Sequence, residues 1–203
     1  MTTVEQPVSL VLASASPRRR EILGALGLSF RVVASDVDET RAEGEPADAY
    51  VARLAREKAA DVAARLRAEG PAAIVLGADT IVVVDGQILG KPSDDEHARA
   101  MIARLSGRAH EVTTAVALVS PPDALSAQAS ITTRVWFRAL APEEVAAYVA
   151  SGDGRDKAGA YAVQGLGSGI VTRVEGSYSN VVGLPAAETL ALLRSVGAVG
   201  RWP

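Results

Sequence analysis

Short apolar runs alternate along the chain with longer stretches in which apolar and polar residues recur periodically. The apolar runs, several of them rich in β-branched residues, have the length and composition of buried strands. The longer stretches repeat apolar residues every three or four positions, as helices that bury one face do. The pattern predicts strands over residues 8–12, 30–34, 73–76, 81–84, 112–119, 131–137 and 170–174. It predicts helices over 17–26, 47–69, from 93 to about 105, 142–150 and 186–193.

The segments between these elements carry signals for turns and helix ends. Asp85-Gly86, which follows an apolar run, is a strong hairpin turn, and Gly70-Pro71 is expected to end the long helix before it. Ser93 with Glu96 makes a capping box for the helix that follows. The Pro/Ser/Ala segment at 121–129 is interpreted as the loop of a second hairpin. Because helices alternate with strands and hairpins join some of them, we expect an α/β protein with a mixed sheet.

Size and composition narrow the class of protein. With 203 residues, 48% of them hydrophobic, the chain can fill one core, and a single domain over 1–203 is predicted. A net charge of −3 excludes the basic character of a general nucleic-acid binder. The lack of cysteine excludes disulfides and thiolate chemistry and fits a reducing, cytoplasmic setting. We expect no signal peptide and no membrane-spanning segment.

Three arginines stand where a helix ordinarily disfavours positive charge. Ser16 is a good N-cap and Pro17 suits a first helical position, so Arg18, Arg19 and Arg20 fall in the first turn. The unpaired N–H groups and the helix dipole at that end attract anions and mildly penalise cations. If a phosphate binds there, the guanidinium groups and the N–H donors meet the same anion. The sequence therefore favours an anion site at this helix start.

Asp79 interrupts the apolar run from Ile74 to Val84. A buried, unpaired carboxylate is expensive, so this aspartate needs a cation, a metal ion or several hydrogen-bond donors. The functional interpretation is a site residue. The alternative is that residues 77–80 form only a bend between two strands, with Asp79 bonded to local N–H groups.

Other charged residues are weak indications when each is taken alone. Lys58 lies on the apolar stripe of the helix over 47–69, where a lysine ordinarily extends its ammonium to solvent. Lys91 lies in a loop ahead of a helix and would ordinarily be solvated. Asp36, Asp38 and Glu39 offer oxygen ligands for a hard cation such as Mg²⁺, although a solvated acidic turn explains them equally. Taken together with the arginines, these residues fit a site for a polyphosphate and its metal ion.

Several familiar motifs can be set aside. The stretch GLGSG at 165–169 leads into a predicted strand, whereas a dinucleotide fingerprint leads into a helix. No phosphate-binding loop of the GxxxxGK[ST] type and no HExxH motif are present. His97 and His110 have no partners in a recognisable motif, and the serines have no His and Asp partners for a hydrolase triad.

Five segments together resemble the Maf family of nucleoside triphosphate pyrophosphatases. They are LASASPRRREIL, VARLAREKA, GADTIVVVDGQILGKP, LSGRAHEVTTAV and DKAGAYAVQGLGSGIV with GSYSNVVGLP, and they run in order from about Ser9 to Leu193. The resemblance implies cleavage between the α and β phosphates, which yields a monophosphate and pyrophosphate. It also implies a divalent metal cofactor (Mg²⁺ or Mn²⁺), a homodimer, and a two-lobed α/β fold. In that fold a mixed twisted sheet is flanked by helices and the active site lies in the cleft.

The resemblance also assigns roles to individual residues. It implies that Asp79 accepts the proton of the attacking water and that Glu39 and Asp79 hold the metal ion. It implies a role in choosing the base for Arg18, Thr80 and Gln164. It implies contact with the triphosphate for Ser14, Arg19, Lys58 and Lys91.

The residues also bear on the branch of the family. Asp79-Thr80, the SPRR segment and Gln164 resemble the branch that acts on dTTP and UTP more than the branch that acts on 7-methyl-GTP. Residues 121–129 and 152–155 depart from the commoner family pattern and lie outside the matched positions. Two other functions stay open at this point. One is a nucleotide-binding regulator of septum formation without significant catalysis, and the other is a phosphatase that releases inorganic phosphate.

Overall fold

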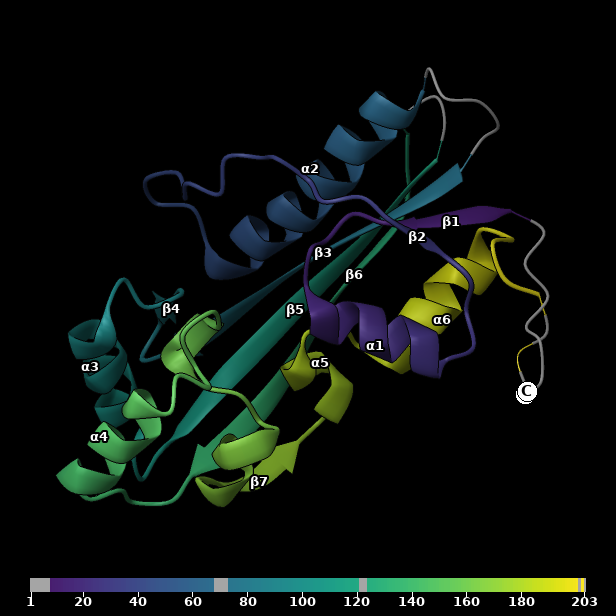
Figure 1. Ribbon diagram of the computed structural model, residues 1–203. Coiled ribbons are helices and arrows are strands. Elements are labelled where there is room, and N and C mark those ends of the chain that lie inside the picture. Colours follow the sequence, from purple (N-terminus) through teal and green to yellow (C-terminus); the bar gives the residue numbers. More distant parts are fainter. Residues whose placement is uncertain (1–7, 68–72, 121–123, 201, 203) are drawn as a thin grey trace. The chain divides into compact units, whose positions relative to one another are not determined.

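The computed structural model describes residues 8–67, 73–120, 124–200 and 202 (Figure 1). Among these residues, seven strands form one mixed sheet in the order β2-β1-β3-β5-β6-β7, with β4 paired to β3. The strands are β1 (Ser9–Leu12), β2 (Arg31–Val32), β3 (Ala73–Val84), β4 (Gln87–Leu89), β5 (Ala109–Ser120), β6 (Ala124–Phe137) and β7 (Val171–Glu175). The α-helices are α1 (Pro17–Ala25), α2 (Ala47–Leu66), α3 (Asp95–Leu105), α4 (Pro142–Ala150), α5 (Tyr178–Val182) and α6 (Ala186–Ser195). Two short 3₁₀ helices, η1 (Ala158–Ala160) and η2 (Gly165–Gly169), complete the set.

The expected α/β class with a mixed sheet is confirmed. Strand β1 pairs in parallel with both β2 and β3, whereas β4 pairs antiparallel with β3 and β7 antiparallel with β6. The chain divides into two compact units. The first unit comprises Met1–Asp79, Thr114–Ile131 and Gly183–Pro203, and the second comprises Thr80–Thr113 and Thr132–Val182.

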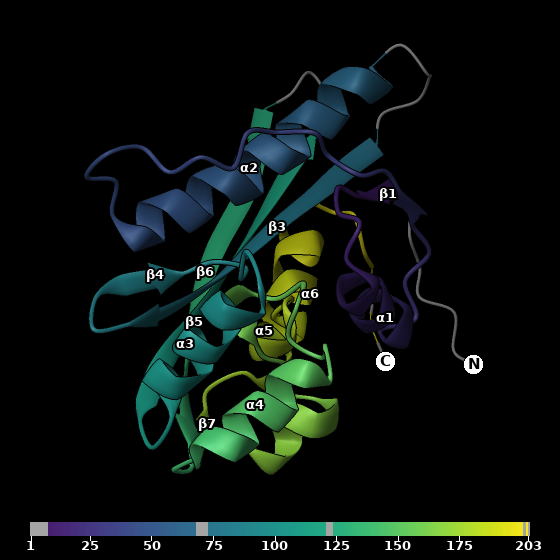
Figure 2. The same ribbon diagram turned by 60° about the vertical axis from the view of Figure 1, so that its left-hand side comes forward.

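In the first unit, helices cover both faces of the parallel strands β1 and β3. Leu12 and Leu76 belong to one buried cluster with Leu23 of α1 and Leu193 of α6. Their neighbours Val11 and Val75 belong to a second cluster with residues of α2. Successive side chains of a strand point to opposite faces, so α1 and α6 lie on one face and α2 on the other (Figures 1 and 2). Burial on both faces explains why these strands read as continuous apolar runs.

The second unit has its own core. Helices α3 and α4 contact each other, and they pack their apolar residues against the ends of β5 and β6 that belong to this unit (Figure 2). Ile102, Leu105, Val112 and Val135 are at most 1% exposed there. No helix within the described ranges is both long and apolar enough to cross a membrane.

A buried aromatic trio lies in the core of the second unit. His110 Nε2 lies 2.7 Å from the hydroxyl of Tyr161, and both rings meet Phe137 edge to face, with centroids 4.9 and 4.7 Å away. His110 is 2% exposed, and burial lowers the pKa of its imidazole to about 4. The folded protein therefore keeps this histidine neutral across the physiological range.

We expect this histidine to make folding stability fall in mildly acidic solution. The folded-state pKa lies below the unfolded value of about 6.5, so between these values the unfolded chain binds more protons. The stabilisation is complete above about pH 6.5 and is lost as the pH falls toward 4, at a cost of about 2 kcal/mol by pH 5. Urea unfolding at pH 7 and pH 5 measures this loss. His110→Gln should remove most of this pH-dependent loss of stability. His97→Gln, at the exposed start of α3, should leave the loss unchanged. An equal loss in the unaltered protein and both variants would contradict this account.

Most predicted elements are confirmed to within a few residues, including the strands at 8–12 and 170–174 and the helix at 142–150. The hairpin turn at Asp85-Gly86 is also confirmed. It joins β3 to β4, and both residues have positive φ, at 51° and 72°. The predicted end of the long helix at Gly70-Pro71 lies outside the described residues, whereas α2 itself ends at Leu66.

Three predictions about the elements are wrong, and one helix was not predicted. The two strands predicted over 73–76 and 81–84 are one continuous strand, β3. Strand β6 begins at Ala124, so most of the loop expected at 121–129 is strand, while residues 121–123 lie outside the described part of the chain. Ser93 is not the cap of α3, because Asp94 is the N-cap and its side chain accepts the bond from His97 N. Helix α5 was not predicted at all.

Candidate active site

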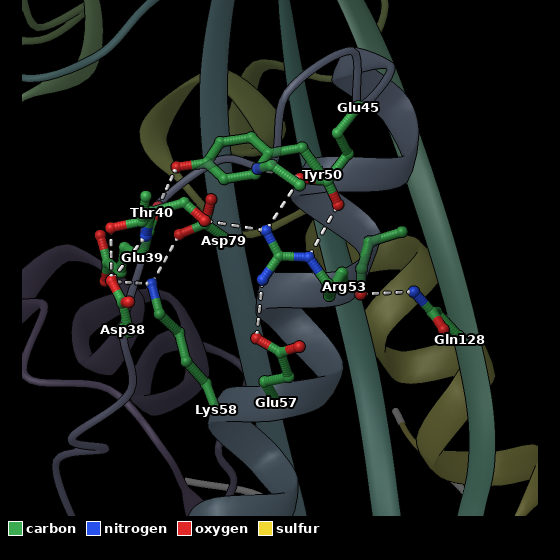
Figure 3. A network of polar contacts seen from close by, with 12 residues as sticks. Asp38, Glu39, Thr40, Glu45, Tyr50, Arg53, Glu57, Lys58, Asp79 and Gln128 are labelled. Atoms are coloured by element: carbon green, nitrogen blue, oxygen red, sulfur yellow. Dashed lines mark hydrogen bonds and ion pairs between the residues drawn. The ribbon is translucent and has the colours of Figure 1, made fainter.

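Asp79 lies within β3 and is 8% exposed. Since the strand runs through residues 77–80 without a break, the interpretation of these residues as a bend is wrong. The carboxylate is neutralised by Lys58 of α2, whose Nζ lies 2.7 Å from Asp79 Oδ1 (Figure 3). Lys58 is itself only 7% exposed, so the alternative of a lysine extended to solvent is also wrong. The cation that a buried carboxylate needs is thus supplied from a helix.

The same lysine holds a second carboxylate. Lys58 Nζ lies 2.6 Å from Glu39 Oε1, so one ammonium bridges Glu39 and Asp79 (Figure 3). Glu39 belongs to a segment, residues 33–46, that contains no helix or strand, and its side chain is 50% exposed. The structure therefore brings together Glu39, Lys58 and Asp79, three of the residues to which the family resemblance assigns a role.

Close packing of α2 on β3 makes this contact geometrically possible. Gly77 and Asp79 are two residues apart in β3, so they face the same side of the sheet. A Cβ at Gly77 would lie 2.2 Å from Ala55 O and 2.7 Å from Ala59 N of α2. The helix can approach so closely only because residue 77 has no side chain. Lys58, adjacent to Ala59, thereby comes within reach of Asp79.

The other acidic residues of the 33–46 segment have different functions in the structure. Asp38 Oδ1 accepts bonds from Thr40 N at 2.9 Å and Thr40 Oγ1 at 2.6 Å, which lower the pKa of Asp38. The backbone N–H of Asp36 donates to Asp61 of α2. Of the three carboxylates in SDVDET, Glu39 is the one that reaches Lys58.

The arginine-rich start of α1 has partners within the protein. Ser16 is the predicted N-cap and accepts a bond from Arg19 N. The Arg19 guanidinium donates through Nε to Gly183 O at 2.9 Å and through Nη1 to Ser14 Oγ at 3.1 Å. Burial lowers the pKa of Arg19, while the negative charge of Asp79 acts in the opposite direction and the charge of Arg18 adds to the lowering. These contacts give Arg19 partners within the protein, and the anion site stays a prediction.

Three of the predicted site residues belong to the second unit. Thr80 follows Asp79 in β3 and is half-buried, Lys91 is exposed between β4 and α3, and Gln164 is exposed just before η2. The main chain ahead of Gln164 is fixed by Tyr148, whose hydroxyl accepts a bond from Ala162 N at 3.1 Å. That these three residues share one site with Asp79, in a cleft, stays a prediction.

Two residues of the site region were missed from the sequence. Tyr50 was counted among the apolar positions of its helix, and Arg53 was not considered. In the structure both donate to main-chain carbonyl groups, Tyr50 to that of Glu39 and Arg53 to that of Thr40 (Figure 3). The spacing of Arg53 and Glu57, four residues apart on one helix, was the available signal for an ion pair.

The residues present fit a divalent cation when the phosphates of a substrate supply further oxygen ligands. Among the described residues no group of three or more His, Cys, Asp or Glu side chains could hold a metal ion. Glu39 and Asp79 are nevertheless two carboxylates already gathered on one positive charge. Mg²⁺ is commonly bound by one or two carboxylates together with substrate phosphates, and the pair meets that requirement.

A family model and curated relatives show the family of this chain. The family model described as "Maf-like protein" matches residues 9–196. A dTTP/UTP pyrophosphatase of Myxococcus xanthus is 54% identical over 193 residues, which are 95% of this chain and 95% of that protein. A dTTP/UTP pyrophosphatase of Escherichia coli is 49% identical over 191 residues, which are 94% of each chain. A solved structure titled as a nucleoside-triphosphatase / dITP/XTP pyrophosphatase from Mycobacterium abscessus covers 64% of this chain and 74% of that one at 17% identity, with a TM-score of 0.38.

Proposed function

We propose that this chain, which belongs to the Maf family, hydrolyses dTTP and UTP between the α and β phosphates and releases the monophosphate and pyrophosphate. The similarity to the dTTP/UTP pyrophosphatases of Myxococcus xanthus and Escherichia coli extends over 94% or more of this chain and supports the assignment. The observation that carries the chemistry is the buried Lys58 bridge between Glu39 and Asp79, which gathers two carboxylates and an ammonium at one point. The biological use would be the removal of unwanted or modified pyrimidine triphosphates.

Asp79 would act as the general base. A carboxylate oxygen can accept the proton of the attacking water, and the Lys58 ammonium lies 2.7 Å from that carboxylate. Phosphoryl transfer demands mostly positioning and neutralisation of charge, which the surrounding cations can supply.

Glu39 and Asp79 would hold Mg²⁺ or Mn²⁺, and the ion, when bound, supplies neutralisation of the phosphate charge. Ser14, Arg19, Lys58 and Lys91 would contact the triphosphate. An ammonium carries three N–H donors, of which Glu39 and Asp79 take two within the described part of the chain, so the third can reach a phosphate oxygen. These charges favour pyrophosphate as the leaving group. We further propose a cytoplasmic homodimer.

A product assay over a panel of nucleotides tests the function. Purified protein with Mg²⁺ or Mn²⁺ is incubated with each triphosphate, and pyrophosphate and inorganic phosphate are measured separately. Pyrophosphate in equal amount to the monophosphate supports the proposal. Release of inorganic phosphate indicates a phosphatase, and tight binding without turnover indicates a regulator.

Gln164 is expected to contribute to the choice of base, together with Arg18 and Thr80. Uracil and thymine present both a carbonyl acceptor and an N3–H donor, and a glutamine amide can pair with both. A site built for those groups rejects bases that lack them. We expect dTTP and UTP to be the best common substrates, CTP to follow, and purine triphosphates to be poor.

Gln164→Ala should reduce the ratio of kcat/KM for UTP to that for CTP and leave the cleavage position unchanged. An equal decrease for every nucleotide would make Gln164 a scaffold residue, and turnover of GTP as fast as UTP would contradict the assigned branch.

A further inference from the structure

Two side chains of α2 hold the main chain at Glu39. The hydroxyl of Tyr50 donates to Glu39 O at 2.8 Å, and Arg53 Nη2 donates to Thr40 O at 3.2 Å (Figure 3). Tyr50 and Arg53 are three residues apart and therefore lie on the same side of the helix. Two consecutive carbonyl groups of a segment without helix or strand are thus fixed to a regular element.

Arg53 is itself firmly placed. It binds Glu45 through two parallel contacts, Nε to Oε1 at 2.7 Å and Nη2 to Oε2 at 2.8 Å, and it donates through Nη1 to Glu57 Oε2 at 2.9 Å. Its guanidinium lies 5.5 Å from the centroid of the Tyr50 ring, in cation–π contact. Arg53 lowers the pKa of Glu45 to about 2, so this pair stays charged at neutral and mildly acidic pH. A two-pronged pair fixes direction as well as distance.

We propose that Tyr50 and Arg53 are positioning residues, which fix the main chain of residues 39–40 so that the Glu39 carboxylate stays with that of Asp79 on Lys58. This inference rests on the proposed function, because the consequence of correct placement is metal-dependent turnover. The Glu39 side chain is half exposed on an irregular segment, so ordering it anew at each binding event would cost conformational entropy. Fixing its main chain removes much of that cost and presents the carboxylate in one place.

The same segment offers a matched control at its other end. Arg65 of α2 donates to Ala34 O at 2.5 Å and pairs with Asp61 at 2.9 Å. Like Arg53, it is an arginine of α2 that bonds a main-chain carbonyl of the 33–46 segment and a carboxylate four residues away. It differs in bonding five residues before Glu39 instead of next to it. A general need for a fastened segment would make Arg53 and Arg65 equivalent, whereas a positioning role for Glu39 would not.

The test compares Tyr50→Phe, Arg53→Met, Arg53→Lys and Arg65→Met with the unaltered protein. For each we measure kcat and KM for dTTP, the Mn²⁺ concentration that gives half of the maximal rate, and direct Mn²⁺ binding by electron paramagnetic resonance. We expect Tyr50→Phe and Arg53→Met to weaken Mn²⁺ activation and binding by about tenfold, the usual order for groups that orient metal ligands. Arg53→Lys should lie in between, and Arg65→Met should resemble the unaltered protein in all three measurements.

The outcomes separate positioning from general stability. An equal shift in Arg65→Met and Arg53→Met would overturn the proposal, as would unchanged Mn²⁺ dependence in Tyr50→Phe and Arg53→Met. If Arg53→Met does not fold, Tyr50→Phe decides, because it removes a single hydroxyl group from a partly buried ring.

A second measurement does not depend on catalysis. Arg41 is exposed within the 33–46 segment, and the rate of tryptic cleavage after it reports how firmly that segment is held. We expect faster cleavage in Tyr50→Phe and Arg53→Met. A protein that releases no pyrophosphate from dTTP would refute the proposed function alone. Unchanged cleavage in both variants would refute the placement by Tyr50 and Arg53, whatever the activity.

Discussion

Asp79→Asn is expected to abolish almost all turnover while the protein stays folded. Asparagine preserves the shape of the side chain but removes both the proton acceptor and one of the two carboxylates proposed for the metal ion. Loss of a general base alone typically lowers the rate by about 10²–10⁴-fold, so we expect kcat to fall by about 10³-fold or more. The fold should survive because Lys58 keeps Glu39 as its counter-ion at 2.6 Å. Steady-state rates at saturating Mn²⁺, together with a melting curve, measure both effects.

Asp61→Asn provides the control for this variant. Asp61 lies on α2 and accepts bonds from the 33–46 segment and from Arg65, whereas the ion pairs of Lys58 among the described residues are with Glu39 and Asp79. Its replacement should leave kcat within about threefold of that of the unaltered protein, because Asp61 lies outside the proposed site. The loss of its ion pair should also cost little stability, since exposed ion pairs contribute little to the free energy of unfolding. Asp79→Asn with activity within about tenfold of the unaltered enzyme would exclude Asp79 as the base.

Gly77→Ala is expected to destabilise the protein strongly. The new Cβ would lie 2.2 Å from Ala55 O and 2.7 Å from Ala59 N, and both atoms belong to the backbone of α2. A flexible side chain could move aside, but a helix backbone must shift as a whole. Overpacking usually costs about 1–3 kcal/mol, and we expect a loss at or above the upper end of this range. The shift would also draw Lys58 away from Asp79, so activity should decrease together with the midpoint of urea unfolding.

Gly24→Ala tests whether the clash or the loss of glycine is responsible. Gly24 lies exposed in α1, and a Cβ there would meet no atom within 4 Å. Alanine is favoured over glycine within a helix by up to about 1 kcal/mol, so this variant should be equally stable or more stable. Similar destabilisation of both variants would contradict the close packing of α2 on β3.

The sequence predicted elements well where burial alone determines them. Helix α4 was predicted over its observed range because its apolar spacing and Pro142 are local signals. Strand β3 was predicted in two pieces because an aspartate in a strand core looks like an interruption. The partner of that aspartate is Lys58, 21 residues earlier in the chain, and no local pattern contains the contact. The strand start at Ala124 was missed for a similar reason, since its small and polar residues become a strand through pairing in the sheet.

The arrangement of the residues in the candidate site could not be predicted from the sequence. The resemblance indicated Glu39, Lys58 and Asp79, yet the bridge formed by one ammonium depends on how a segment without regular structure returns to α2. Tyr50 was not predicted as a site residue because its ring fits an apolar stripe. Its hydroxyl donates to Glu39 O, and a hydrophobic pattern does not show such a contact. The partners of Arg19 are likewise distant, as Gly183 lies 164 residues further along.

The division of the chain into units has a consequence for synthesis on the ribosome. The first unit contains both ends of the chain, and its core joins Leu10 and Leu12 to Leu190 and Leu193 of α6. That core cannot be completed until the last helix has left the exit tunnel, whereas every residue of the second unit, which ends at Val182, has been translated earlier. Contacts between such distant residues also slow folding, because the chain must close a large loop before they form. During translation the face of β1 and α1 that packs on Leu190 and Leu193 therefore stays without this partner until α6 has been made, whereas α2 can cover the opposite face of β1 much earlier.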